Sequence, residues 1–169
     1  MITRKELQEM CVYDATSGEL RWKYTRNSRA LKGKRVGCLD KHGYIVTLIG
    51  KKNYLVHRLV WLFIYGRLPK IVDHINGIKD DNRLSNLRSC TVQQSAKNKG
   101  IFANNKTGYK GVSICTRSQR YQVTCRVNGI KKWLGYFDDV LLAAAAYQAY
   151  AKQQHAEFYR PPKEYFESN

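Results

Sequence analysis

The segment Ile71-Val72-Asp73-His74-Ile75-Asn76-Gly77 joins a short strand signal to a tight-turn signal. Its apolar residues are β-branched and favour an extended backbone, and Asn-Gly is typical of a two-residue hairpin turn. A polar stretch follows at residues 80–86, anchored by Leu84 and Leu87, and a helix is predicted at residues 91–99 with Thr91 as its N-cap. The expected order is therefore strand, turn, extended return and helix.

Asp73 and His74 are residue types that suit metal-assisted cleavage of a phosphodiester. A carboxylate can hold a hard divalent cation, and an imidazole can take a proton from water near neutral pH. A nearby amide can orient the imidazole, and Arg83 and Arg88 can hold the phosphate. Neighbouring residues on a strand point to opposite faces, so both side chains reach one phosphate only at a strand edge or a bend. On residue types alone, a polar hairpin with a structural histidine explains the cluster equally well.

The chain before this segment shows short strand and helix signals. Thr3 caps a predicted short helix at residues 3–11, with Glu6 three residues on as in a capping box. His57 begins a later apolar helix, where packing or capping is the favoured interpretation. The other expected elements are strands flanking the turn at 14–18, strands at 43–49 and 54–56, and the helix at 57–65.

After residue 108 the pattern changes to strict alternation. Residues 120–127 place apolar side chains on one strand face and polar side chains on the other. Asn128-Gly129 predicts a turn into a strand at 130–137, with a first strand at 109–115. An Ala-rich helix capped by Asp138 or Asp139 would run to about residue 155 and cover one face of the sheet. The open face can enter a DNA major groove, and it would present Arg120, Gln122, Thr124, Arg126, Lys131 and Trp133.

The charge points to a polyanionic partner. Lys and Arg number 30 against 13 Asp and Glu, a formal net charge of +17. Residues 82–137 contain basic side chains and no acidic one, which is typical of a nucleic-acid-binding surface. Residues 26–35 form a second basic stretch, equally compatible with a solvated loop and a DNA contact.

The sequence also excludes some classes of protein. Its 5 cysteines are an odd number without a Cys-x-x-Cys pair, which argues against a disulfide framework and a structural zinc site. No apolar run approaches the roughly 20 residues of a membrane span, and the N-terminus lacks the apolar core of a signal peptide. We expect no membrane partner and a place in the cytoplasm.

Several motifs occur in order within roughly residues 10–100. They are His57-Arg58-Leu59-Val60-Trp61, Val72-Asp73-His74-Ile75-Asn76-Gly77, Asp81-Asn82-Arg83 and Asn86-Leu87-Arg88. Together they resemble the HNH endonucleases, and in particular phage-type homing and nicking enzymes. The resemblance implies a ββα-metal fold with one divalent cation, magnesium or manganese. It makes Asp73 a metal ligand, His74 the general base and Asn86 the residue that orients His74.

The chain departs from the HNH pattern at one position. The resemblance places the last metal ligand, an Asn or His, about nine residues after Asn86, where this chain has Ser95. A hydroxyl is a weaker, neutral ligand. The alternative interpretation is therefore a sequence-specific DNA-binding protein with an inactive nuclease module. A third interpretation is an RNA-associated basic protein. This interpretation explains the charge but leaves the pair Asp73 and His74 unexplained.

The C-terminal part also resembles a known family. Tyr109-Lys110-Gly111-Val112, Trp133-Leu134-Gly135-Tyr136-Phe137 and the Ala-rich helix from Ala143 are similar to the ethylene-response-factor (APETALA-type) DNA-binding domain. The resemblance spans roughly 107–158 and implies a three-stranded sheet in the major groove. The residues it would turn toward DNA are Lys110, Ser113, Arg120, Gln122, Thr124, Arg126, Lys131 and Trp133, with Arg117 near a phosphate.

The predicted fold class is α+β, an HNH module followed by a three-stranded antiparallel sheet packed on one helix. The expected domains are a nuclease domain at 1–100 with its ββα-metal core at about 70–100, a linker at 101–108, a DNA-binding domain at 109–160 and a tail at 161–169. The expected function is site-specific hydrolysis of double-stranded DNA by a homing or nicking endonuclease. We expect a monomer, with a dimer as the alternative.

Overall fold

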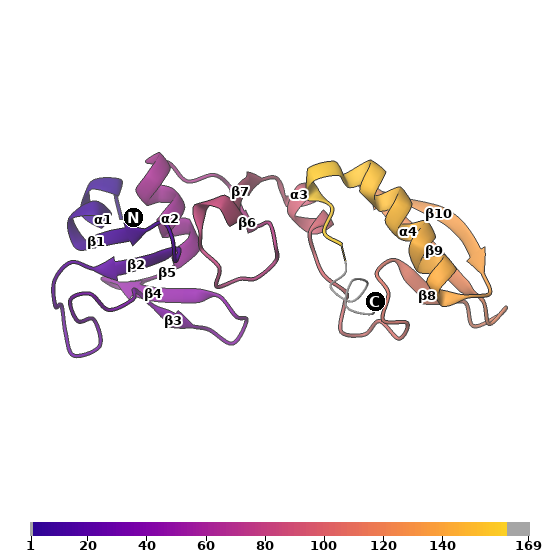
Figure 1. The fold of residues 1–169 in the computed structure, drawn as a ribbon, viewed down its shortest axis with the longest axis horizontal. Helices are drawn as coiled ribbons and strands as arrows, with labels where there is room; N and C mark the ends of the chain where they lie inside the picture. The colour runs from indigo at the N-terminus through magenta and orange to yellow at the C-terminus, as the bar shows by residue number, and fades with distance from the viewer. Residues whose placement is uncertain (1, 162–169) are drawn as a thin grey trace. The chain divides into compact units, whose positions relative to one another are not determined.

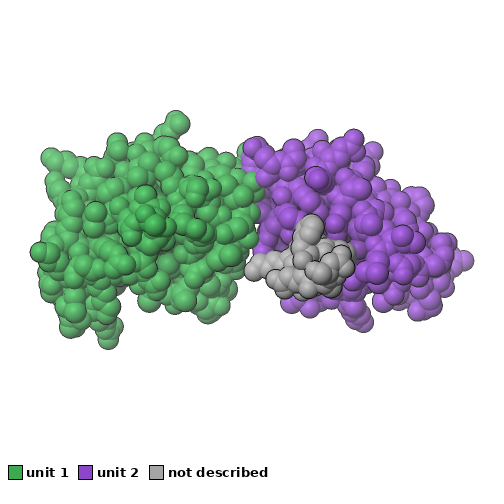
Figure 2. Space-filling view, viewed as in Figure 1, with its two compact units in different colours: residues 1–91 green, residues 92–169 purple. Residues whose placement is uncertain are grey.

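The computed structural model describes residues 2–161, so the expected tail lies outside the described residues from 162 onward. The chain divides into two compact units, residues 1–91 and residues 92–169 (Figure 2). Each unit has a separate hydrophobic core. None of the helices within residues 2–161 is both long and apolar enough to cross a bilayer.

The first unit begins with the predicted helix and hairpin. Helix α1 (Arg4–Met10) starts from the Thr3–Glu6 capping box, and the next residues form the antiparallel pair β1 (Cys11–Asp14) and β2 (Glu19–Trp22). A second sheet has the order β3-β4-β5 and leads into helix α2 (Val56–Tyr65), which ends at Gly66. Its strands are β3 (Cys38–Leu39), β4 (Ile45–Ile49) and β5 (Lys52–Leu55). The short strand β3 was not predicted.

The core of the first unit joins these elements. Leu7 from α1, Leu20 from β2 and Val60 from α2 are fully buried in one cluster. Val72 and Leu87 belong to the same cluster. The polar hairpin that carries Asp73 and His74 is therefore anchored on the core by its apolar residues.

That hairpin has the predicted order, but residues 75–86 join its strands where Asn76-Gly77 indicated a two-residue turn. Strand β6 (Ile71–His74) pairs antiparallel with β7 (Leu87–Cys90), and a short 3-10 turn, η1 (Leu84–Asn86), precedes β7 (Figure 1). The register places His74 opposite Leu87 and Asp73 opposite Arg88. The helix expected next is α3 (Val92–Lys97), which belongs to the second unit.

The second unit is the predicted sheet on a helix. Strands β8 (Val112–Ile114), β9 (Tyr121–Val127) and β10 (Ile130–Phe137) form an antiparallel sheet in the order β10-β9-β8. Helix α4 (Val140–His155) is capped by Asp139 and followed by the 3-10 turn η2 (Ala156–Phe158). The α+β class is thus confirmed.

Small residues allow α4 to lie close to the sheet in the second unit. Ala143, Ala144 and Ala151 are buried with Val123 and Cys125 of β9. Gly111 has φ +77, and a Cβ there would lie 2.1 Å from the ring of Tyr147. The side chain of Tyr147 therefore fills the space that a larger residue at position 111 would need.

Candidate active site

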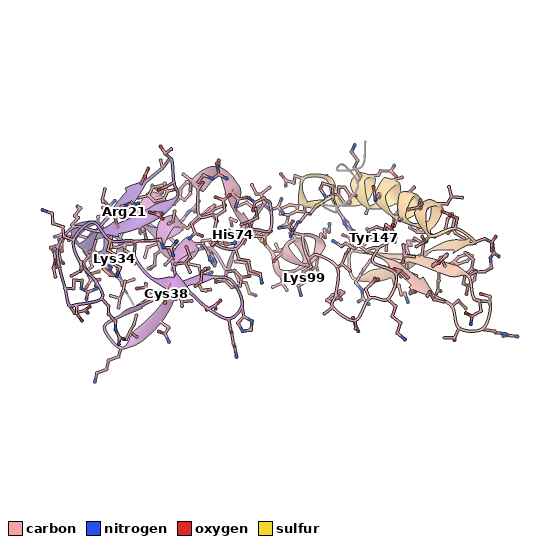
Figure 3. The ribbon with its side chains drawn as sticks, turned by 60° about the horizontal axis from the view of Figure 1, so that its bottom comes forward. Arg21, Lys34, Cys38, His74, Lys99 and Tyr147 are labelled. Atoms are coloured by element: carbon pink, nitrogen blue, oxygen red, sulfur yellow. The ribbon has the colours of Figure 1, made fainter. Side chains whose placement is uncertain are left out.

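His74 is held in a fixed orientation at the end of β6. Its side chain is buried in the first unit (Figure 3). Its Nε2 atom lies 3.0 Å from Oδ1 of Asn82, which is also buried. A carboxamide oxygen only accepts hydrogen bonds, so this contact favours the tautomer with the proton on Nε2 and the basic lone pair on Nδ1. An imidazole held in this way can act as a general base.

The surroundings of His74 keep it neutral. Burial lowers the pKa of His74, while the hydrogen bond to Asn82 and the carboxylates of Asp73 and Asp81 oppose that shift. Because burial is the largest effect, the imidazole is unprotonated at neutral pH, which is the state that a proton acceptor needs.

The amide at the His74 ring is not the one that the sequence indicated. Asn86 was expected to orient His74, but its Oδ1 accepts a hydrogen bond from the backbone N–H of Asn76 at 2.9 Å. Its Nδ2 donates to the backbone oxygen of Asp81 at 2.8 Å. Since Leu87 pairs with His74, Asn86 lies one residue beyond the ladder and beside the turn. Asn86 therefore fixes the turn at 76–81, while Asn82 contacts the imidazole.

Both predicted phosphate-binding arginines contact carboxylates of the protein. Arg88 Nη2 lies 3.2 Å from Oδ2 of Asp73 across the β6–β7 ladder, and both side chains are largely buried. Arg83 donates to both oxygens of Asp81, at 2.8 and 2.7 Å. Hydrogen bonds from Arg83 and Asn76 lower the pKa of Asp81 to about 2. Asp81 is therefore ionised, and its interactions hold the turn next to His74.

Two aromatic rings that the sequence did not place at the site lie against His74. The ring of His57 on α2 meets the ring of His74 edge-on, with centroids 4.8 Å apart. The ring of Tyr44 lies 5.5 Å from His57 and 6.1 Å from His74. Burial lowers the pKa of His57 to about 3. His57 is therefore a neutral packing residue, and no local sequence pattern indicates that its neighbour is His74.

Comparison with known proteins finds a family match over the segment that contains His74. Residues 54–97 match the family model described as HNH endonuclease. This segment is similar to the HNH endonuclease domain. It contains β6, the turn, β7 and α3, together with α2.

Two relatives carry the same description. The chain is 34% identical over 129 residues to an uncharacterized HNH endonuclease of Acanthamoeba polyphaga mimivirus, a match that covers 74% of this chain and 65% of the relative. It is 32% identical over 99 residues to a protein of the SPbeta prophage of Bacillus subtilis named as a putative HNH homing endonuclease, covering 54% of each. The chain thus spans less than two thirds of either relative. No solved structure matches the chain, and no comparison supports the resemblance of residues 107–158 to the ethylene-response-factor domain.

The HNH domain offers one clear oxygen ligand for a hard cation. The Asp73 carboxylate is the type of ligand that hard cations take, but it lies 3.2 Å from the Arg88 guanidinium, a positive group that competes with a metal. Ser95 is partly exposed on α3 in the second unit, and its role as a ligand stays a prediction. Within residues 2–161, no cluster of three His, Cys, Asp or Glu side chains could hold a metal.

Outside residues 54–97, the open face of the β8–β10 sheet carries most of the residues predicted to face DNA. The register aligns Ser113 with Gln122, Thr124 with Trp133, and Arg126 with Lys131. Trp133 is 59% exposed. Arg117 is exposed in the loop between β8 and β9.

A β-bulge adds one residue that the alternation pattern missed. The register shifts between Trp133 and Gly135, where Gly135 has φ 129. The shift pairs Tyr136 with Gln122, and the Tyr136 ring lies 5.6 Å from that of Trp133. Tyr136 therefore joins the open face, although its position in the sequence predicts the opposite face.

Two predicted DNA contacts are engaged within the protein instead. Lys110 Nζ donates to the backbone oxygens of Lys97 and Lys99, at 2.8 and 2.5 Å, and burial lowers its pKa to about 8. Lys110 thus binds the carbonyls at the end of α3, which corrects the prediction that it faces DNA. Arg120 Nε donates to Oδ1 of Asp138 at 2.7 Å, although both side chains are exposed.

Proposed function

We propose that the chain is a DNA endonuclease in which His74 is the general base and Asp73 holds one divalent cation. The single observation that supports this most is the buried His74, oriented by Asn82 and adjacent to Asp73, inside a segment that matches the HNH endonuclease model. A buried, neutral and oriented imidazole is the arrangement that proton abstraction from water needs.

In the proposed reaction, His74 takes a proton from a water molecule through Nδ1. The water oxygen forms a bond to the scissile phosphorus, the bond from phosphorus to the 3′ oxygen breaks, and that oxygen takes a proton from solvent while His74 later returns its proton to solvent. The products are a 5′-phosphate and a 3′-hydroxyl. A bound divalent cation supplies stabilisation of the negative charge on the phosphate and the departing oxygen. One such site in a monomer would nick one strand, in keeping with a homing or nicking type.

The open face of the second unit is the proposed contact with duplex DNA. Arg126 and Lys131 lie side by side in the register, next to the Trp133–Thr124 pair. Basic side chains supply salt-dependent affinity for phosphates, and a β-surface can read base edges in the major groove.

The viral and prophage origins of the relatives support a place in a bacterial host or infected cell.

Two observations favour a second candidate, a DNA-binding protein with an inactive nuclease module. Asp73 is paired with Arg88, and Ser95 offers only a neutral hydroxyl at the predicted second ligand position. Both features weaken metal binding relative to a site with a free carboxylate and an amide or imidazole ligand.

Cleavage of supercoiled plasmid with magnesium or manganese separates the two candidates. The comparison uses the wild-type chain, Ser95→Asn and His74→Ala, each shown to bind the plasmid. The nuclease is supported if the wild type or Ser95→Asn nicks the plasmid. This nicking should be absent in His74→Ala and should stop when a chelator is added. Bound plasmid that stays intact with all three proteins supports the binding protein.

A further inference from the structure

The N-terminal hairpin contacts the segment that orients His74. Tyr13 lies on β1, more than sixty residues before Asn82. Its hydroxyl donates to the backbone oxygen of Asn82 at 3.2 Å and accepts a hydrogen bond from the backbone N–H of Leu84 at 3.0 Å. One hydroxyl therefore holds the backbone on both sides of Arg83.

The turn of the same hairpin contacts this segment directly. Gly18 has φ +76, and a Cβ at this position would lie 2.3 Å from the backbone nitrogen of Arg83 and 2.6 Å from the carbonyl carbon of Asn82. No side chain fits there without displacing the 82–83 backbone. Tyr13 and Gly18 thus fix this backbone from one hairpin.

We infer that Tyr13 is a positioning residue for His74, acting through Asn82. The side chain of Asn82 contacts His74 Nε2, while its backbone is held by Tyr13 and Gly18. A shift of the 82–84 backbone would move Oδ1 away from the ring and weaken the contact that favours one ring orientation and one tautomer. This role of Tyr13 rests on the proposed function of His74 as the base.

The structure offers a matched pair of substitutions. Tyr13→Phe removes one hydroxyl and keeps the ring. Tyr54→Phe is the control, because the Tyr54 hydroxyl also accepts a backbone hydrogen bond, from Ile2 at 3.2 Å, in the same unit. Both tyrosines pack against the same core. A purely structural role predicts similar effects for the two variants.

Two readouts test the inference on the full chain. The first is the single-turnover rate of plasmid nicking with all the DNA bound, which Tyr13→Phe should reduce by about 10- to 100-fold with unchanged DNA affinity. The second is the pair of ¹⁵N resonances of the His74 ring. They should show one tautomer in the wild type and in Tyr54→Phe, and shift toward averaged values in Tyr13→Phe.

The outcomes are distinct. A slower rate and shifted resonances in Tyr13→Phe alone support the inference. Resonances and rate unchanged from the wild type, or equal changes in both variants, overturn it. If neither the wild-type chain nor Ser95→Asn cleaves DNA, the proposed function fails, and the His74 resonances alone still decide whether Tyr13 positions the ring. Gly18→Ala is a second variant expected to give the same resonance shift.

Discussion

Asn82 Oδ1 and His74 Nε2 lie 3.0 Å apart in a buried setting, and this contact fixes which nitrogen of His74 can accept a proton. Asn82→Ala leaves the Nε2–H group buried without this acceptor. We expect it to lower the free energy of unfolding by about 1–3 kcal/mol and to slow nicking with little change in DNA affinity. Urea unfolding and the nicking assay measure the two effects. A wild-type nicking rate in this variant would show that the contact does not orient the base.

His57 should make stability depend on pH. Burial lowers its pKa from 6.5 to about 3, so between these values the unfolded chain binds a proton that the folded protein does not. The contribution of neutral His57 is complete above about pH 6.5 and is lost as the pH falls, by about 1.4 kcal/mol per pH unit.

His57→Phe tests that contribution, because it removes the titrating group and keeps an aromatic ring against His74. Urea unfolding at a series of pH values between about 4 and 7.5 should give a shallower loss of stability for the variant. Its stability at neutral pH should be equal or higher, since Nδ1 of His57 is buried without a hydrogen-bond partner among the described residues. Equal slopes for the two proteins would mean that His57 is not the group responsible.

Arg88 should oppose metal binding in the absence of DNA. Its guanidinium lies 3.2 Å from Asp73, so an incoming cation meets a positive charge beside its carboxylate ligand. We expect Arg88→Met to bind Mn²⁺ more tightly than the wild type in calorimetric titration with the metal alone, and Asp73→Asn to bind it more weakly. Weaker binding by Arg88→Met would instead show that Arg88 holds Asp73 in place for the metal.

The open sheet face should account for part of the salt dependence of DNA binding. If Arg126 or Lys131 neutralises one phosphate, its substitution by Gln should reduce the slope of log affinity against log salt by about 0.9. Lys110→Met should leave the slope unchanged, because that ammonium binds the carbonyls of Lys97 and Lys99. If the slope of log affinity against log salt decreased only in Lys110→Met, Lys110 and not the open sheet face would contact the phosphates.

Local sequence patterns correctly predicted several elements of the fold. The Asn128-Gly129 turn, the capping box at Thr3 and the alternation of residues 120–127 indicated the β9–β10 hairpin, the first helix and the open sheet face. Each depends on residues close together in the chain, where propensity and periodicity apply.

The details that the sequence missed depend on contacts between distant segments. Asn82 reaches His74 on a backbone held by Tyr13 and Gly18. Lys110 binds a carbonyl at the end of α3, where the last carbonyls of a helix have no intrahelical partner. At Tyr136, a one-residue bulge reverses the face that alternation predicts.

The proposed nuclease function depends above all on His74 performing the proton transfer in DNA cleavage. The most direct test is the nicking rate of supercoiled plasmid by His74→Gln with magnesium or manganese, at protein concentrations that bind all the DNA. We predict that His74→Gln binds DNA as the wild type does and nicks it about 100-fold more slowly, or slower still. Nicking by His74→Gln at the wild-type rate would contradict this role of His74.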